Sequence, residues 1–146
     1  MDFKKYTEFI RAIEIDNVSL GQVQAKRIWS EGLPNNPVFT IHYEAHRVES
    51  KTGKLKFKTD FIVKGYDEDQ KEFPDVMEML FSLELQYDIS SLDETLFEER
   101  EYEELLEIFK KRNIPLNCWP YAREFISSMT LRMGFPALVI GAFKNC

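Results

Sequence analysis

The sequence predicts an α+β domain in which a four-stranded antiparallel sheet packs against two or three helices. Three runs in the middle of the chain alternate apolar and polar residues, which is the period of half-buried strands. Short turn signals join the runs, and this favours antiparallel neighbours with one apolar face. Helical spacing follows, and helices must cover that face. With 146 residues, 44% of them apolar, the chain fits one domain over residues 1–146.

The N-terminal region is expected to form a helix of about ten residues followed by the first strand. The apolar positions of this strand are Ile13, Ile15, Val18 and Leu20. An irregularity is expected within it, at Asp16-Asn17. Residues 29–37 then contain two prolines, a glycine and two asparagines, so they predict a long irregular connection.

The three alternating runs cover residues 38–48, 54–64 and 77–89. A hairpin turn is predicted at Lys51-Thr52-Gly53, between the first two runs. The second run carries lysines and an aspartate opposite its apolar residues, so the outer face of the sheet is expected to be wet. An acidic loop is expected over residues 65–72, before the last run.

Two helices are predicted to complete the chain. Residues 93–112 place acidic side chains early and basic side chains late, as the helix dipole favours. Pro115 is expected to end this helix. A second helix is predicted from Pro120, which fits a first helical turn, to Met133. Gly134 can supply its left-handed C-terminal cap.

Composition excludes several classes of function. A net charge of −6 and a pI near 5.0 argue against binding to nucleic acid. No apolar run of 18 residues exists that could span a membrane, and the N-terminus lacks the pattern of a signal peptide. Cys118 and Cys146 have neither metal-binding nor redox spacing, which favours free thiols in a reducing, cytoplasmic location.

The chain offers no anchor for an enzyme. His42 and His46 lie on a predicted strand, where four residues span roughly 13 Å, too far for the two rings to share one metal ion easily. The acidic run at 98–107 is typical of a solvated helix face, and the glycines are scattered singly, so they form no phosphate-binding loop. We therefore expect no catalytic residue, no metal and no cofactor.

Aromatic residues are abundant, at 14% of the chain. They indicate either a Phe-rich core or an apolar surface reserved for subunits or clients. The predicted helix 120–133 carries two adjacent apolar stripes, which indicates burial on more than one side. Packing within the chain and packing between subunits both remain open for this helix. The candidate subunit-interface residues are Tyr121, Phe125, Met129 and Met133.

The segment from Pro115 to Ile140 resembles the C-terminal core of SecB, the bacterial export chaperone. The resemblance rests on Pro120-Tyr121-Ala122-Arg123-Glu124 and on Gly134-Phe135-Pro136-Ala137-Leu138. It implies a sheet backed by helices, a dimer of dimers formed through edge strands and the long helix, and no active site. The implied function is ATP-independent holding of unfolded or pre-secretory polypeptides in apolar grooves.

The resemblance also suggests where clients would bind. Carried over by position, the candidate client-binding residues are Trp29, Leu33, Phe135, Leu138, Ile140 and Phe143. Trp29 and Leu33 are in addition large apolar groups in a predicted loop, where mobility would let them adapt to many sequences. Packing of both residues on the protein's own core is the alternative.

The sequence departs from export chaperones after residue 140. Those proteins continue with an Asn-Phe-Asp motif, a further helix and an acidic tail that contacts the translocation motor, whereas residues 141–146 read Gly-Ala-Phe-Lys-Asn-Cys. Contact with the motor is therefore doubtful. The similarity is greater to short SecB-like chaperones, some of which guard one dedicated client such as a toxin–antitoxin partner. A module that binds a small apolar ligand and a subunit of a fixed complex remain as alternatives.

Overall fold

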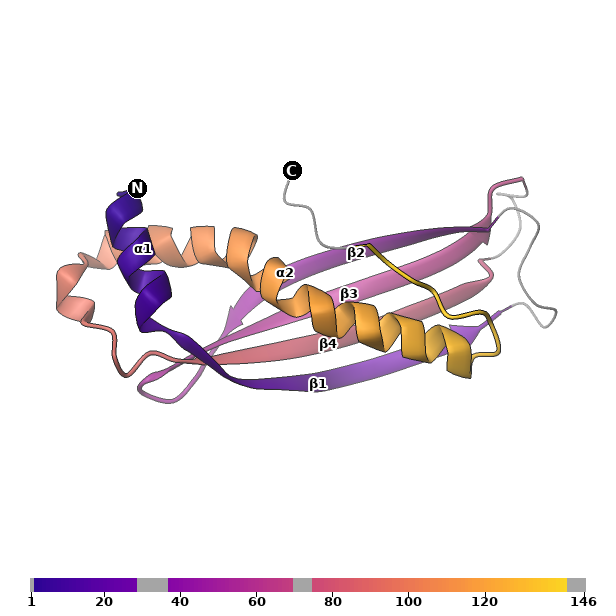
Figure 1. The fold of residues 1–146 in the computed structure, drawn as a ribbon, viewed down its shortest axis with the longest axis horizontal. Helices are drawn as coiled ribbons and strands as arrows, with labels where there is room; N and C mark the ends of the chain where they lie inside the picture. The colour runs from indigo at the N-terminus through magenta and orange to yellow at the C-terminus, as the bar shows by residue number, and fades with distance from the viewer. Residues whose placement is uncertain (1, 29–36, 70–74, 142–146) are drawn as a thin grey trace.

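The computed structural model describes residues 2–28, 37–69 and 75–141 (Figure 1). Its elements are α1 (Phe3–Ala12), β1 (Glu14–Arg27), β2 (Pro37–Val48), β3 (Lys54–Asp67), β4 (Met77–Asp88), a 3-10 turn (Glu94–Leu96) and α2 (Glu99–Arg132). The four strands form one antiparallel sheet in the order β1-β4-β3-β2. The predicted fold class is confirmed, with two helices on one face of the sheet.

The two central strands follow the predicted alternation. In β3, Leu55, Phe57 and Val63 are almost fully buried, while the lysines between them point to the other face. The hairpin before β3 turns at Gly53, whose φ of 81° is one that glycine adopts without strain. β3 continues to Asp67, so the prediction of a loop from residue 65 is wrong for its first three residues.

Gly65 explains why β3 can continue. A Cβ atom at this position would lie 2.7 Å from the ring of Phe39 on β2, and 3.1 Å from Met77 on β4. Only a residue without a side chain fits between these neighbours. The glycine therefore extends the strand here and does not begin a loop.

The outer strand β1 is longer and less regular than the sequence predicts, since it runs on to Arg27. Its register with β4 shifts between Ile15 and Asn17, as predicted, and again between Leu20 and Val23. At the second shift the Ser82 hydroxyl accepts the N–H of Gln22 at 3.0 Å. In contrast, β2 pairs with β3 without any register shift. The two edges of the sheet therefore differ in regularity.

One continuous helix replaces the two that the sequence predicts. α2 runs through Pro115 and Pro120, and it changes direction near its middle (Figure 1). Each proline removes a backbone hydrogen bond and bends the helix. Burial outweighs this cost, because Ile114 and Cys118 are fully buried on the sheet. The prediction that Pro115 ends a helix is wrong because tertiary packing continues across it.

The N-terminal helix packs on the first half of α2. The ring of Phe9 meets Phe109 edge-on at 5.4 Å and Tyr102 at 6.3 Å, and Phe9 is fully buried. Lys5 adds an ion pair with Glu101 at 2.7 Å. α1 therefore covers one end of the core. The second half of α2 lies over the rest of the sheet without α1 beside it (Figure 1).

Candidate functional site

The position of α2 defines two flanks on the core face of the sheet. The helix packs over β2, β3 and β4. On one side Asn117 donates to the Tyr87 hydroxyl of β4 at 2.8 Å. On the other side the ring of Trp119 meets Tyr43 of β2, with centroids 6.3 Å apart. One flank of α2 therefore faces β4 and β1, and the other faces β2.

The flank toward β1 is apolar and open. Three residues of β1 lie directly opposite core residues of β4: Ile15 opposite Tyr87, Leu20 opposite Leu83 and Val23 opposite Phe81. Directly opposed residues share a face of the sheet, and these partners on β4 are at most 4% exposed. Ile15, Leu20 and Val23 are nevertheless 43%, 46% and 40% exposed. We call these three residues the β1 strip.

The β1 strip has the dimensions of a polypeptide site. Its end residues lie opposite Tyr87 and Phe81, which are six positions apart on the regular strand β4 and so span about 20 Å. A client segment of about seven extended residues therefore has the same length. Tyr121 lies one helical turn beyond Asn117, on the same side of α2, and is 46% exposed. An aromatic side chain is thus available on the helix above this flank.

The C-terminal end of α2 is built as the sequence predicts. Gly134 has a φ of 87°, its N–H donates to the carbonyl of Leu131 at 3.0 Å, and the N–H of Phe135 donates to that of Thr130 at 3.1 Å. These two bonds form the Schellman cap. Arg27 of β1 adds a bond from Nη1 to the Met133 carbonyl at 2.9 Å, where the helix dipole favours a positive charge.

The flank toward β2 carries the chain's own C-terminal segment. Residues 136–141, which we call the strap, run back alongside α2 without regular secondary structure (Figure 1). Leu138 and Ile140 pack against the core, whereas Val139 between them is 81% exposed. The N–H of Leu138 donates to the Thr130 hydroxyl at 2.9 Å, and Trp119 Nε1 donates to the Gly141 carbonyl at 2.7 Å.

The predicted client-binding residues are only partly placed by the structure. Trp29, Leu33 and Phe143 lie outside the described residues. Phe135 is buried, with 3% exposure, beneath the guanidinium group of Arg27, which lies 4.7 Å from its ring centroid. Leu138 and Ile140 are brought together on the strap, so the structure places both on the β2 flank.

The predicted interface residues lie along the second half of α2. Phe125 packs on the core, with its ring 4.5 Å from that of Phe81, and Met129 and Met133 are half-buried beside it. Tyr121 is the most exposed of the four. Sequence reasoning missed the β1 strip as a surface, because its alternation matches that of any strand whose apolar face a helix covers.

Side chains that could carry chemistry are dispersed. His42 and His46 are exposed on β2. Burial raises the pKa of the Cys118 thiol to about 11, although a bond to the Thr59 hydroxyl opposes the shift, so the thiol is protonated at neutral pH. Within the described ranges, no three His, Cys, Asp or Glu side chains are grouped for a metal ion, and no helix there is long and apolar enough to cross a bilayer.

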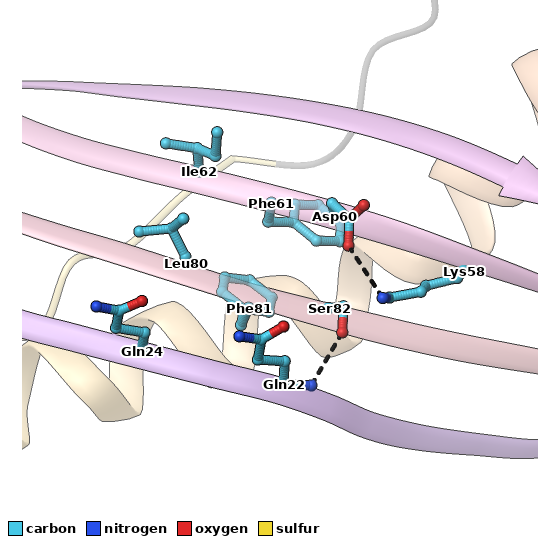
Figure 2. A pocket seen from close by; sticks show the side chains of 9 residues that line it. All are labelled: Gln22, Gln24, Lys58, Asp60, Phe61, Ile62, Leu80, Phe81 and Ser82. Carbon is cyan, nitrogen blue, oxygen red and sulfur yellow. Dashed lines mark hydrogen bonds and ion pairs between the residues drawn. The ribbon is translucent and has the colours of Figure 1, made fainter.

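The outer face of the sheet holds an open hollow of about 300 Å³ (Figure 2). Gln22, Gln24, Ile62 and Leu80 are among the residues that line it. Charges beside it are paired within the sheet, since Lys58 lies 3.9 Å from Asp60 and Lys56 lies 3.4 Å from Glu84. This mixed and open surface differs from the enclosed aromatic cavity that a small apolar ligand would require.

Comparison with known proteins identifies the fold. No known protein family and no curated protein matches the sequence. Among solved structures, the chain is similar to the Mycobacterium tuberculosis SecB-like chaperone Rv1957, solved in complex with a ChAD peptide from the antitoxin HigA1. The TM-score is 0.78 at 16% sequence identity, over 98% of this chain and 100% of that chain. The protein therefore has the SecB-like fold, as the motifs at 120–124 and 134–138 implied.

Proposed function

We propose that the protein is an ATP-independent chaperone that holds unfolded polypeptides against the β1 strip. The observation that carries this proposal is the exposure of Ile15, Leu20 and Val23 on the face of the sheet that otherwise forms the core. Exposed apolar residues grouped on one face of a sheet are typical of an interaction site. The structural similarity to a SecB-like chaperone bound to a peptide supports the same function.

Binding would rest on many weak apolar contacts. Each Å² of apolar surface removed from water contributes about 25 cal/mol, so a segment spread over the strip gains affinity in small increments. Such contacts select for apolar side chains on an extended backbone, and folded proteins do not expose segments of this kind. Selectivity would therefore come from the unfolded state of the client, and no residue would do covalent work.

We further propose a dimer of dimers, with Tyr121, Phe125, Met129 and Met133 as candidate interface residues. Trp29, Leu33 and Phe143 stay candidates for client binding on the basis of the sequence. We also propose a cytoplasmic location, as the sequence predicts. Subunit contacts would also change access to the β1 strip, so the mass of the assembly must be measured together with client binding.

A dedicated client is the second candidate function. It is favoured by the antitoxin peptide bound to the similar chaperone Rv1957. The two candidates differ in client range. A general holdase would delay aggregation of unrelated unfolded proteins, including pre-secretory ones, whereas a dedicated chaperone would protect one partner, such as an antitoxin.

Light scattering of a chemically unfolded client tests the function and the site together. We expect the protein to suppress aggregation and the double variant Leu20→Asp/Val23→Asp to need at least tenfold more protein for the same effect. Ile62→Asp is the matched control, because Ile62 is 37% exposed but lies on the outer face of the sheet. Circular dichroism checks folding. A wild-type protein that suppresses aggregation of neither unrelated clients nor an antitoxin would contradict the proposal.

The same variants separate a client site from a subunit interface. Light scattering coupled to size exclusion gives the mass of each protein. Loss of suppression at unchanged mass supports client binding at the strip. Loss of mass in Leu20→Asp/Val23→Asp would instead assign the strip to contact between subunits.

A further inference from the structure

We propose that the strap occupies a second polypeptide site, between α2 and β2, and that an extended apolar client segment binds there by replacing it. The site, which we call the strap groove, is the surface of α2 around Trp119 and Thr130 on which residues 136–141 lie. This inference rests on the proposed function and adds to it the chemistry of the bound segment.

The strap is held in the way that an extended peptide is held. Leu138 and Ile140, two residues apart, are directed toward the core, and Val139 points away from it. This is the alternation of an extended chain lying on a surface. Peptides that bind in extended form use the same arrangement, with alternate side chains in contact and the backbone bonded to the receptor.

Two hydrogen bonds hold the backbone of the strap on α2. The Thr130 hydroxyl accepts the N–H of Leu138, and Trp119 Nε1 donates to the carbonyl of Gly141. Thr130 is itself 1% exposed, so its bond to the strap is shielded from water. Any extended segment presents equivalent N–H and C=O groups, and a client could therefore make both bonds whatever its sequence.

The strap does not fill the space beside it. A hollow of about 310 Å³ lies between Leu138–Ile140 and the helix residues Pro120, Arg123, Glu124 and Ser127. This hollow is open to solvent, so the strap lies beside a surface depression that it leaves free. A client segment with larger apolar side chains would have room to extend into it.

These features define the ligand as an extended segment with large apolar residues at positions i and i+2. Because strap and client compete, the apparent affinity for the client is the intrinsic affinity multiplied by the fraction of molecules in which the strap is detached. Weakening the strap should therefore strengthen client binding. A strap that served as a wall of the groove would give the opposite result.

Binding of a fluorescent peptide to the full-length protein tests the exchange. The probe carries this chain's own sequence Phe-Pro-Ala-Leu-Val-Ile-Gly, and fluorescence anisotropy reports its affinity. We expect Leu138→Ala/Ile140→Ala to bind the probe at least tenfold more tightly than the unaltered protein. Val139→Ala is the matched control on the same segment, and its affinity should be unchanged. Unchanged or weaker binding by a folded double variant would overturn the proposal.

Hydrogen exchange on the unaltered protein provides a measurement that needs no variant. The amide of Leu138, bonded to Thr130, should exchange faster when the probe peptide is added, because the strap is displaced. Slower exchange would identify the strap as a wall and overturn the proposal. Aggregation assays separate the two ideas: suppression without strap exchange defeats only this inference, whereas exchange without suppression defeats only the proposed holding function.

Discussion

The two flanks of α2 lie on the same apolar face of the sheet, and they differ in what covers that face. On the β2 flank the strap lays Leu138 and Ile140 against the core. On the β1 flank, among the described residues, Leu20 is 46% exposed although its partner Leu83 is 4% exposed. One helix therefore covers too little of a four-stranded sheet, and a short extended segment of the chain adds to the cover on one side.

The end of α2 decides which flank is covered. The left-handed turn at Gly134 reverses the chain, and Arg27 holds the last turn of the helix to the end of β1. From there the strap returns on the side of Trp119 and β2 (Figure 1). The direction of this turn therefore places the strap on the β2 flank and leaves the β1 strip without it.

Truncation of two facing leucines gives the largest expected contrast between covered and open positions. Leu83→Ala should lower the free energy of unfolding by about 3 kcal/mol, since it leaves a cavity in the core. Leu20→Ala, on the same face but half-exposed, should cost about 1 kcal/mol. Urea unfolding of both variants measures the difference. An equal and concentration-dependent loss for Leu20→Ala would show that a second copy covers the strip.

The sequence predicted well those features whose cause is local. The alternation of β3 and β4 predicted their faces, the position of Asp16 predicted a shift in β1, and Gly134 predicted the helix cap. Pro115 misled because its effect depends on burial of the surrounding helix. Exposure of the β1 strip could not be predicted either, since it depends on where α2 lies across the sheet.

Substitution of two glycines tests the turn that directs the strap. Gly134 and Gly53 both have positive φ, so alanine at either position costs about 1–2 kcal/mol in backbone strain. A Cβ at Gly134 would also lie 2.6 Å from Arg27 Nη1, whereas the space around Gly53 is open. Gly134→Ala should therefore destabilise by about 1 kcal/mol more than Gly53→Ala in thermal unfolding. Equal losses would mean that Arg27 moves aside freely.

Removal of one hydroxyl tests how the strap is fastened. Thr130→Val keeps the shape of the side chain but leaves the Leu138 N–H without its acceptor, so a loss of about 1 kcal/mol in unfolding free energy is expected. Thr7→Val is the control, because the Thr7 hydroxyl donates to the Phe3 carbonyl of its own helix on an exposed surface. Its effect should stay within a few tenths of a kcal/mol. Similar effects in both variants would show that this bond does not hold the strap.

The smallest effect concerns the shift in β1 that precedes the open strip. Bonds from Lys54 first, and then from Gln86 at 2.9 Å, lower the pKa of Asp16 below its ordinary value of 3.8. Because the pKa of Asp16 is lower in the folded state than in the unfolded state, the ionised carboxylate stabilises the fold at any pH above the ordinary pKa. This stabilisation is lost as the pH falls through the lowered pKa. Asp16→Asn should therefore flatten the decline of stability below about pH 4.

Lys54→Gln provides the matched test of this pH dependence, because it removes the main cause of the shift. Both single variants should flatten the acid limb of a plot of urea midpoint against pH, and the double variant should add little, since the two residues act as one pair. Additive changes would assign the acid sensitivity to other carboxylates.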